Sequence, residues 1–152
     1  MPDVSLKSAK CLKGEVSPPS DKSISHRAVM LASLAEGKSE ITNFLRSEDT
    51  LSTVRVFRSL GVDIQEAAGG NTFIVNGKGL DSLKEPQGIL DCGNSGTTMR
   101  MSSGILAGSP FMSVLSGDGS LNKRPMRRIV KPLREMARRL ASRFHAPTSR
   151  AE

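Results

Sequence analysis

Two segments of this chain combine small hydroxyl residues with basic residues at points where helices are expected to begin. Residues 21–27 read Asp-Lys-Ser-Ile-Ser-His-Arg, and residues 93–100 read Gly-Asn-Ser-Gly-Thr-Thr-Met-Arg. The first N–H groups of a helix are unpaired and carry partial positive charge, so anions bind there readily. The two segments therefore predict a fold that alternates strands with helices and binds phosphate-like groups at two helix starts.

The first segment is expected to form a helix capped by Ser23 or Ser25 and closed by Gly37. Lys22 would lie just outside this helix and Arg27 about one turn inside it. The alternative is that both are ordinary surface residues, but a lysine at a helix start opposes the helix dipole unless an anion is bound. The apolar residues at helical spacing are Ile24, Ala28, Leu31, Ala32 and Ala35.

The order of the expected elements repeats along the chain. The first unit has the order strand, helix, strand, helix, strand, strand. Its strands are expected at Val4–Val16, Lys38–Phe44, Val62–Glu66 and Thr72–Asn76, and its second helix runs from the Ser47 cap to Gly61. The second unit stops after strand, helix, strand, helix, at Ile89–Cys92, Ser95–Leu106, Phe111–Ser116 and from about Pro125.

The second basic segment has glycines on both sides of its helix entry. Gly93 and Gly96 would allow the backbone to approach a ligand closely. The segment matches neither the Walker pattern nor the dinucleotide-binding spacing. A purely structural helix entry is the alternative, in which Arg100 would face solvent instead of an anion.

A third cluster, Lys123-Arg124-Pro125-Met126, precedes the last expected helix. Proline at the first helical position would hold Arg124 at the helix start as an anion ligand. Arg127 and Arg128 would lie inside the helix, where a solvated basic face is the simpler interpretation.

The net charge of +7 is concentrated in the last part of the chain. Residues 123–150 hold ten Lys or Arg and one acid, whereas residues 1–122 hold twelve bases and thirteen acids. Nucleic-acid binding by the basic helix is an alternative, but the helix has no interleaved aromatic residues and no known nucleic-acid motif. We therefore expect small anions, and no nucleic acid, as partners.

No metal or cofactor is predicted. Cys11 and Cys92 match no metal or redox spacing, and His26 has no second ligand at metal spacing, so it is expected to be structural. Two cysteines without a secretory leader indicate a reducing, cytoplasmic location. No apolar run approaches the ~20 residues of a membrane span, so no membrane partner is expected.

Taken together, the three clusters resemble the enolpyruvyl transferases, and within them the 5-enolpyruvylshikimate-3-phosphate (EPSP) synthases. The matching segments are residues 20–28, 90–100 and 123–126, and the resemblance runs from about Val4 to Met136. Ser23 after Lys22, and a 117–124 loop without cysteine, favour this branch over the sister enzyme that acts on UDP-N-acetylglucosamine.

The resemblance implies an α/β fold (α+β in some schemes) built from βαβαββ units of the family's inside-out barrel, with one complete unit and most of a second. It also implies transfer of the enolpyruvyl group of phosphoenolpyruvate to the 5-hydroxyl of shikimate 3-phosphate, with phosphate released and no cofactor. The herbicide glyphosate is implied to occupy the phosphoenolpyruvate pocket.

The resemblance also assigns roles to residues of this chain. Lys22 is implied to be catalytic and to contact both substrates near the reacting hydroxyl. The residues implied to bind the shikimate phosphate are Ser23 and Arg27. The residues implied to hold phosphoenolpyruvate, or to support its pocket, are Gly96, Arg124, Asn94, Thr97 and Arg100.

The resemblance also divides the chain into three parts. We expect a strand segment and hinge at residues 1–20, a partial N-terminal transferase domain at 21–136, and a divergent, poorly ordered basic tail at 137–152. The chain is much shorter than family members, so two functions stay open. It is part of the transferase, acting with a complementary C-terminal fragment, or it is a non-catalytic anion-binding fragment that keeps half of the substrate site.

Overall fold

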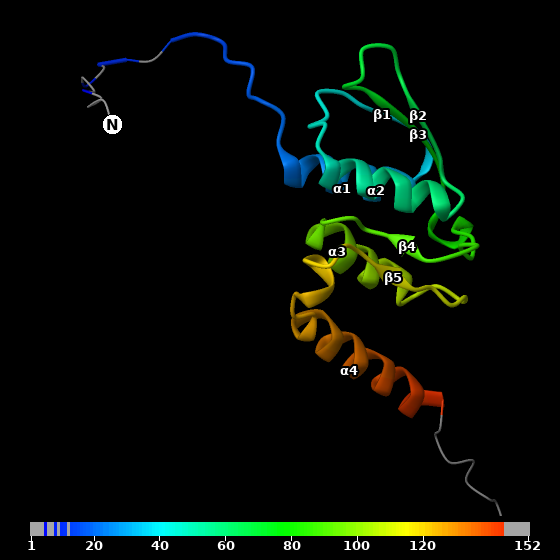
Figure 1. Cartoon of the computed structure of the whole chain (residues 1–152). Coiled ribbons are helices and arrows are strands. Elements are labelled where there is room, and N and C mark those ends of the chain that lie inside the picture. Colours follow the sequence, from blue (N-terminus) through cyan, green and yellow to red (C-terminus); the bar gives the residue numbers. More distant parts are fainter. Residues whose placement is uncertain (1–4, 6–7, 9, 12, 145–152) are drawn as a thin grey trace, which may run out of the picture.

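The computed structural model describes residues 5, 8, 10, 11 and 13–144. Its first unit contains a three-stranded antiparallel sheet in the order β1-β3-β2, with α1 and α2 packed against it (Figure 1). The elements of this unit are α1 (Lys22–Leu34), β1 (Glu36–Ile41), α2 (Glu48–Ser59), β2 (Asp63–Glu66) and β3 (Phe73–Lys78).

The second unit follows the first through a short 3-10 helix, Leu80–Ser82, and lies beneath it in Figure 1. Its strands β4 and β5 pair in parallel, and α3 packs against α2. The elements are β4 (Leu90–Asp91), α3 (Gly96–Leu106), β5 (Leu115–Ser116), a 3-10 helix (Leu121–Lys123) and α4 (Arg127–Phe144).

The core lies between the sheet and the helices and combines aliphatic side chains with Phe44, Phe57 and Phe73. Along β3, Phe73, Val75 and Gly77 are buried in strict alternation, as expected for a strand with one face on the core. The Phe73 ring packs edge-on against Phe44 with a centroid distance of 4.6 Å. At Gly77 a Cβ atom would lie 2.2 Å from the carbonyl oxygen of Ala35, so glycine allows α1 to rest directly on the strand.

The predicted start and end of α2 are confirmed. The Ser47 hydroxyl accepts a hydrogen bond from the Thr50 N–H, and the Thr50 hydroxyl accepts one from the Ser47 N–H at 3.0 Å. These two bonds form a capping box, which satisfies two donors at the helix start. Gly61 follows the helix with φ of +87°.

Ser47→Ala is expected to lower the free energy of unfolding by about 1 kcal/mol, because it removes this cap. Urea unfolding followed by circular dichroism measures the change. Ser59→Ala is the matched control, since the Ser59 hydroxyl only donates back to the Arg55 carbonyl at the exposed end of the same helix. A control variant as destabilised as Ser47→Ala would contradict the capping role.

The prediction for α1 was wrong in its cap, its end and its buried face. Asp21, not Ser23 or Ser25, caps the helix by accepting from the Ile24 N–H at 2.7 Å, so Lys22 is the first helical residue. The helix ends at Leu34, and Gly37 lies within β1 with φ of +105°. An aspartate with its side chain on the third N–H outcompetes the serines, whose hydroxyls lie inside the first turn.

The apolar spacing along α1 also pointed to the wrong face. Ile24 and Leu31 are 62% and 67% exposed. The buried face instead carries several polar residues that have hydrogen-bond partners in the interior, and it consists of Ser25, His26, Val29, Met30, Ala32 and Ser33. Polar residues with internal partners can be buried at little cost, and periodicity of apolar residues does not detect them.

The expected strand over Val4–Val16 is absent from the described residues of that range, and residues 1–4, 6–7, 9 and 12 lie outside the description. Val16 is 84% exposed, and a strand needs a neighbouring strand to satisfy its backbone. The strand expected at Phe111–Ser116 is limited to Leu115–Ser116, where pairing with β4 is possible.

The expected start of the last helix was also wrong. The last helix begins at Arg127 and not at Pro125, since Arg124 closes the preceding 3-10 helix and keeps an extended backbone. The helix then continues to Phe144, through part of the segment expected to be poorly ordered; residues 145–152 lie outside the description. Arginine, leucine and alanine are strong helix formers, which explains the continuation.

Candidate anion-binding site

The guanidinium groups of Arg100 and Arg124 both lie close to Gly96, the first residue of α3. Gly96 is buried, and an ideal Cβ atom at this position would lie 2.8 Å from Arg100 Nη1 and 3.4 Å from Arg124 Nη1. Ser95 caps the helix by accepting from the Thr98 N–H, so the helix start is ordered. Because Gly96 has no side chain, both positive charges lie close to the positive end of the helix dipole.

Arg124 is held in place by a chain of hydrogen bonds. Its Nη2 donates to Asn94 Oδ1 at 2.6 Å, and Asn94 Nδ2 donates to Asp118 Oδ2 at 2.5 Å. Asp118 Oδ1 in turn accepts from the Leu121 N–H at 2.7 Å, at the start of the 3-10 helix. The amide of Asn94 therefore has a fixed orientation, with its oxygen toward the cation and its nitrogen toward the carboxylate.

The pKa of Asp118 lies below its ordinary value, first because Asn94 donates to the carboxylate and then because the Leu121 N–H does. An ordinary aspartate has a pKa of ~3.9. Because the pKa of Asp118 is lower than this in the folded state, its carboxylate stays ionised and keeps these contacts as the pH falls below that ordinary value. The contacts are lost only when the pH falls through the lower pKa of the folded state. We expect the carboxyl ¹³C signal of Asp118 to titrate below the range of ordinary aspartates. Asn94→Ala should move that midpoint upward, and an unchanged midpoint would contradict the assigned cause.

Lys22 lies at the start of α1 and forms an ion pair with Asp49 of α2. Its side chain is 50% exposed, so part of it stays accessible to solvent. Ser23 and Arg27 are exposed on the same helix, and their side chains form no hydrogen bond or ion pair with another described residue. The structure thus connects Lys22 to α2 and leaves Ser23 and Arg27 accessible to a ligand.

The structure brings together four of the residues singled out by the sequence: Asn94, Gly96, Arg100 and Arg124. Thr97 is half-buried beside them on α3. Sequence reasoning did not single out Asp49 or Asp118. Asp49 forms an ion pair with Lys22, and Asp118 holds Asn94, which holds Arg124. Their position next to helix starts is the sequence feature that could have identified them.

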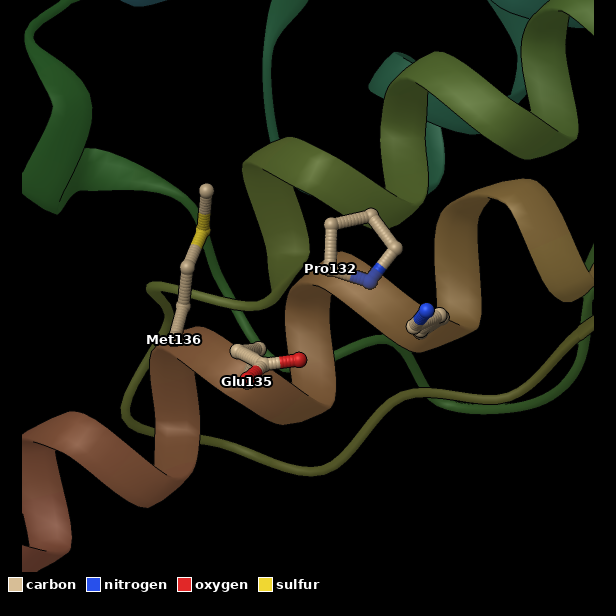
Figure 2. A pocket seen from close by; sticks show the side chains of 4 residues that line it. Pro132, Glu135 and Met136 are labelled. Carbon is tan, nitrogen blue, oxygen red and sulfur yellow. The ribbon is translucent and has the colours of Figure 1, made fainter.

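A groove of about 780 Å³ runs from Arg100 along the start of α4. Four of its lining residues are basic, and the lining consists of Arg100, Pro125, Arg127, Arg128, Ile129, Lys131 and Pro132. A smaller pocket of about 290 Å³ lies further along α4 between Lys131, Pro132, Glu135 and Met136 (Figure 2). The smaller pocket combines one cation with one carboxylate, so the basic groove is the better anion environment.

Within the described part of the chain, no three His, Cys, Asp or Glu residues lie close enough to hold a metal ion. None of the helices described is both long enough and apolar enough to cross a membrane.

Comparison with known proteins identifies the family of this chain. Residues 6–146 match the family model of EPSP synthase (3-phosphoshikimate 1-carboxyvinyltransferase). The chain belongs to the EPSP synthase family. The matched range ends at residue 146 and so includes part of the segment after Met136, whose divergence from the family stays a prediction.

The relatives agree in sequence and in fold. The 3-phosphoshikimate 1-carboxyvinyltransferase of Thermodesulfovibrio yellowstonii is 56% identical over 138 residues, which cover 91% of this chain and 32% of the relative. That of Bacillus licheniformis is 54% identical over 132 residues, or 87% of this chain and 30% of the relative. The solved EPSP synthase from Acinetobacter baumannii superposes with a TM-score of 0.76 and 48% identity, over 82% of this chain and 28% of that one.

These matches confirm the expected α/β fold of the EPSP synthases. The chain spans about a third of the length of the curated relatives, at 32% and 30% of the two compared above.

Proposed function

We propose that this chain supplies one half of the substrate site of a 3-phosphoshikimate 1-carboxyvinyltransferase. The reaction transfers the enolpyruvyl group of phosphoenolpyruvate to the 5-hydroxyl of shikimate 3-phosphate and releases phosphate. The observation that supports this most directly is the pair of guanidinium groups, from Arg100 and Arg124, at the side-chain-free start of α3.

In this proposal the two helix starts take different substrates. Phosphoenolpyruvate, or glyphosate in its place, lies against Gly96 and is bound by Arg124, with Asn94, Thr97 and Arg100 in support. A guanidinium matches the geometry of a carboxylate or phosphate and binds it through two parallel hydrogen bonds. Because Asn94 holds Arg124 in advance, little side-chain freedom is lost on binding.

Shikimate 3-phosphate binds at the start of α1 through its phosphate. Ser23 offers a hydroxyl and Arg27 a guanidinium, both exposed and uncommitted among the described residues. Lys22 lies between the two substrates and contacts both. Its ammonium is a mobile point charge, which suits a group that must follow charge as it develops during the transfer.

In this proposal the chain contributes one half of the site, and we propose that a complementary polypeptide with the remaining part of the family fold completes it. The exposed side chains of Ile24 and Leu31 on α1 support such a covering partner. We infer small anions, and neither nucleic acid nor membrane, as ligands, since no aromatic side chains alternate with the arginines of α4. We infer a cytoplasmic location, which the free, buried Cys92 supports.

Titration of the ¹⁵N-labelled chain with phosphoenolpyruvate tests the proposal directly. We expect a saturable shift of the Gly96 amide signal, and a smaller response to inorganic phosphate. Arg124→Gln should weaken binding, whereas Arg46→Gln should not, because Arg46 pairs with Glu66 on the sheet. Absence of a saturable shift, or an equal loss in both variants, would overturn the site.

The alternative of a non-catalytic anion-binding fragment predicts the same titration but no recovery of activity. Mixing the chain with the remaining part of a relative separates the two. Phosphate release that depends on both polypeptides supports the transferase, and binding without release supports the fragment.

A further inference from the structure

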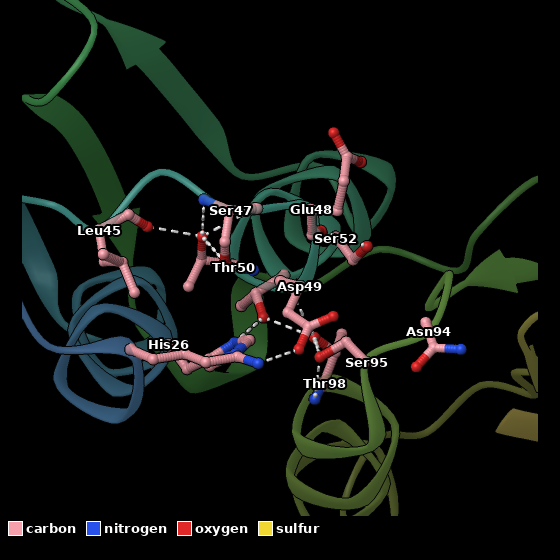
Figure 3. Close-up of polar contacts among 12 residues, drawn as sticks. His26, Leu45, Ser47, Glu48, Asp49, Thr50, Ser52, Asn94, Ser95 and Thr98 are labelled. Atoms are coloured by element: carbon pink, nitrogen blue, oxygen red, sulfur yellow. Dashed lines mark hydrogen bonds and ion pairs between the residues drawn. The ribbon is translucent and has the colours of Figure 1, made fainter. Parts of the chain in front are cut away.

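A buried row of polar side chains joins the helices that carry the two halves of this site (Figure 3). The Thr98 hydroxyl lies 2.7 Å from Ser95 Oγ and 2.8 Å from Thr53 Oγ1. Thr53 Oγ1 lies 2.6 Å from His26 Nδ1. The row therefore crosses from the cap of α3, through α3 and α2, to α1, and each member is at most 1% exposed.

The same threonine is also connected to Lys22. Thr98 Oγ1 lies within donating distance, 3.3 Å, of the backbone carbonyl of Asp49. The side chain of Asp49 forms the ion pair with Lys22. One residue, Asp49, thus contacts the Lys22 ammonium with its carboxylate and the Thr98 hydroxyl with its carbonyl. Thr98 in turn contacts the cap residue next to Gly96.

The contacts among Ser95, Thr98, Thr53 and His26 are directional and shielded from water. A buried hydroxyl that loses its partner has no water to replace it, so the helices cannot slide past each other without leaving polar atoms unsatisfied. Burial lowers the pKa of His26, and the nearby Asp49 opposes that shift, so at pH 7 the imidazole is neutral with one N–H for its two ring nitrogens. Whether Thr53 donates to His26 Nδ1 or accepts from it depends on which ring nitrogen carries that hydrogen.

We propose that Thr98 is a positioning residue that sets the separation between the Lys22 ammonium and the backbone of Gly96. Its hydroxyl, shared among Ser95, Thr53 and the Asp49 carbonyl, keeps the two helix starts at the spacing needed to bind two anions side by side. This inference rests on the proposed function, because it assigns both helix starts to one site. Thr98 is not expected to touch either substrate.

The test compares three variants of the full 152-residue chain. Thr98→Val keeps the shape and removes the hydroxyl, and Thr98→Ser keeps the hydroxyl. Ser102→Ala is the matched control, because Ser102 is buried on the same helix and its hydroxyl has no partner among the described residues. We expect Thr98→Val to weaken phosphoenolpyruvate binding about 10-fold, with Thr98→Ser and Ser102→Ala within about 2-fold of the parent.

A second measurement separates positioning from loss of stability. Urea unfolding gives the folded fraction of each variant, and affinities are compared for folded protein only. Removing Lys22 as Lys22→Met should cost less affinity in the Thr98→Val background than in the parent, because the two residues act through one connection. Additive losses, or a Thr98→Ser variant as weak as Thr98→Val, would overturn the inference.

Failure of the proposed function gives a different result. If the parent chain binds no phosphoenolpyruvate, the site assignment fails. The inference is then judged in the ligand-free chain by the Asp49 carboxyl ¹³C and Gly96 amide signals. Both signals should shift in Thr98→Val and stay in place in Ser102→Ala, and unchanged signals in Thr98→Val would overturn it.

Discussion

The 152-residue chain alone is expected to release no measurable phosphate from phosphoenolpyruvate and shikimate 3-phosphate. The carboxylates near the site are already engaged, Asp49 with Lys22 and Asp118 with Asn94. His26 is 1% exposed and cannot reach a substrate. Neither these two carboxylates nor His26 is therefore a free proton donor or acceptor, and missing proton-transfer groups typically cost about 10²–10⁴-fold in rate.

A coupled phosphate-release assay measures this, with and without the remaining part of a relative as a separate polypeptide. We expect activity only in the mixture, since binding energy from one half stabilises the ground state and the transition state alike. The same mixture prepared with the Lys22→Met variant measures the background activity of any contaminating host enzyme. Turnover by the chain alone near that of a full-length relative, abolished by Lys22→Met, would contradict the expectation.

Local signals in the sequence were enough for much of the first unit. The Ser47 cap, the Gly61 stop and the two successive strands β2 and β3 depend on residues within a few positions of one another, and each is confirmed. The buried face of α1 was missed because His26 finds its partner, Thr53, 27 positions away. A hydrogen bond over that separation leaves no trace in local periodicity.

In the candidate site, too, the features that depend on neighbouring residues could be predicted, whereas the long-range contacts could not. The start of α3 at Gly96 follows from serine and glycine in sequence, and its place beside Arg100 follows from one helical turn. The contact of Arg124 with Asn94 joins residues 30 positions apart, and only the folded chain reveals that Asp118 completes it. Pro125 also shows that a favoured helix start is not always used, since the 3-10 helix before it ends at Arg124.

Gly96→Ala is expected to separate stability from binding. Gly96 has no positive φ and is the first residue of α3, so alanine fits the backbone. Its methyl group would meet Arg100 Nη1 at 2.8 Å, which is the far end of a flexible side chain that can move aside. The free energy of unfolding should therefore stay the same or rise by about 0.5–1 kcal/mol, as for other strain-free Gly→Ala changes.

Phosphoenolpyruvate binding should respond very differently. The methyl group occupies the space between the two guanidinium groups and displaces that of Arg100, so charge-assisted hydrogen bonds are lost and affinity falls about 30-fold. Gly104→Ala is the matched control, since a Cβ atom at Gly104, on the same helix, meets nothing within 4 Å. Amide titrations and urea unfolding of both variants measure the two effects. Unchanged affinity in Gly96→Ala would show that no ligand approaches this helix start, and a parallel loss of stability would show that the methyl group disturbs the fold instead of the site.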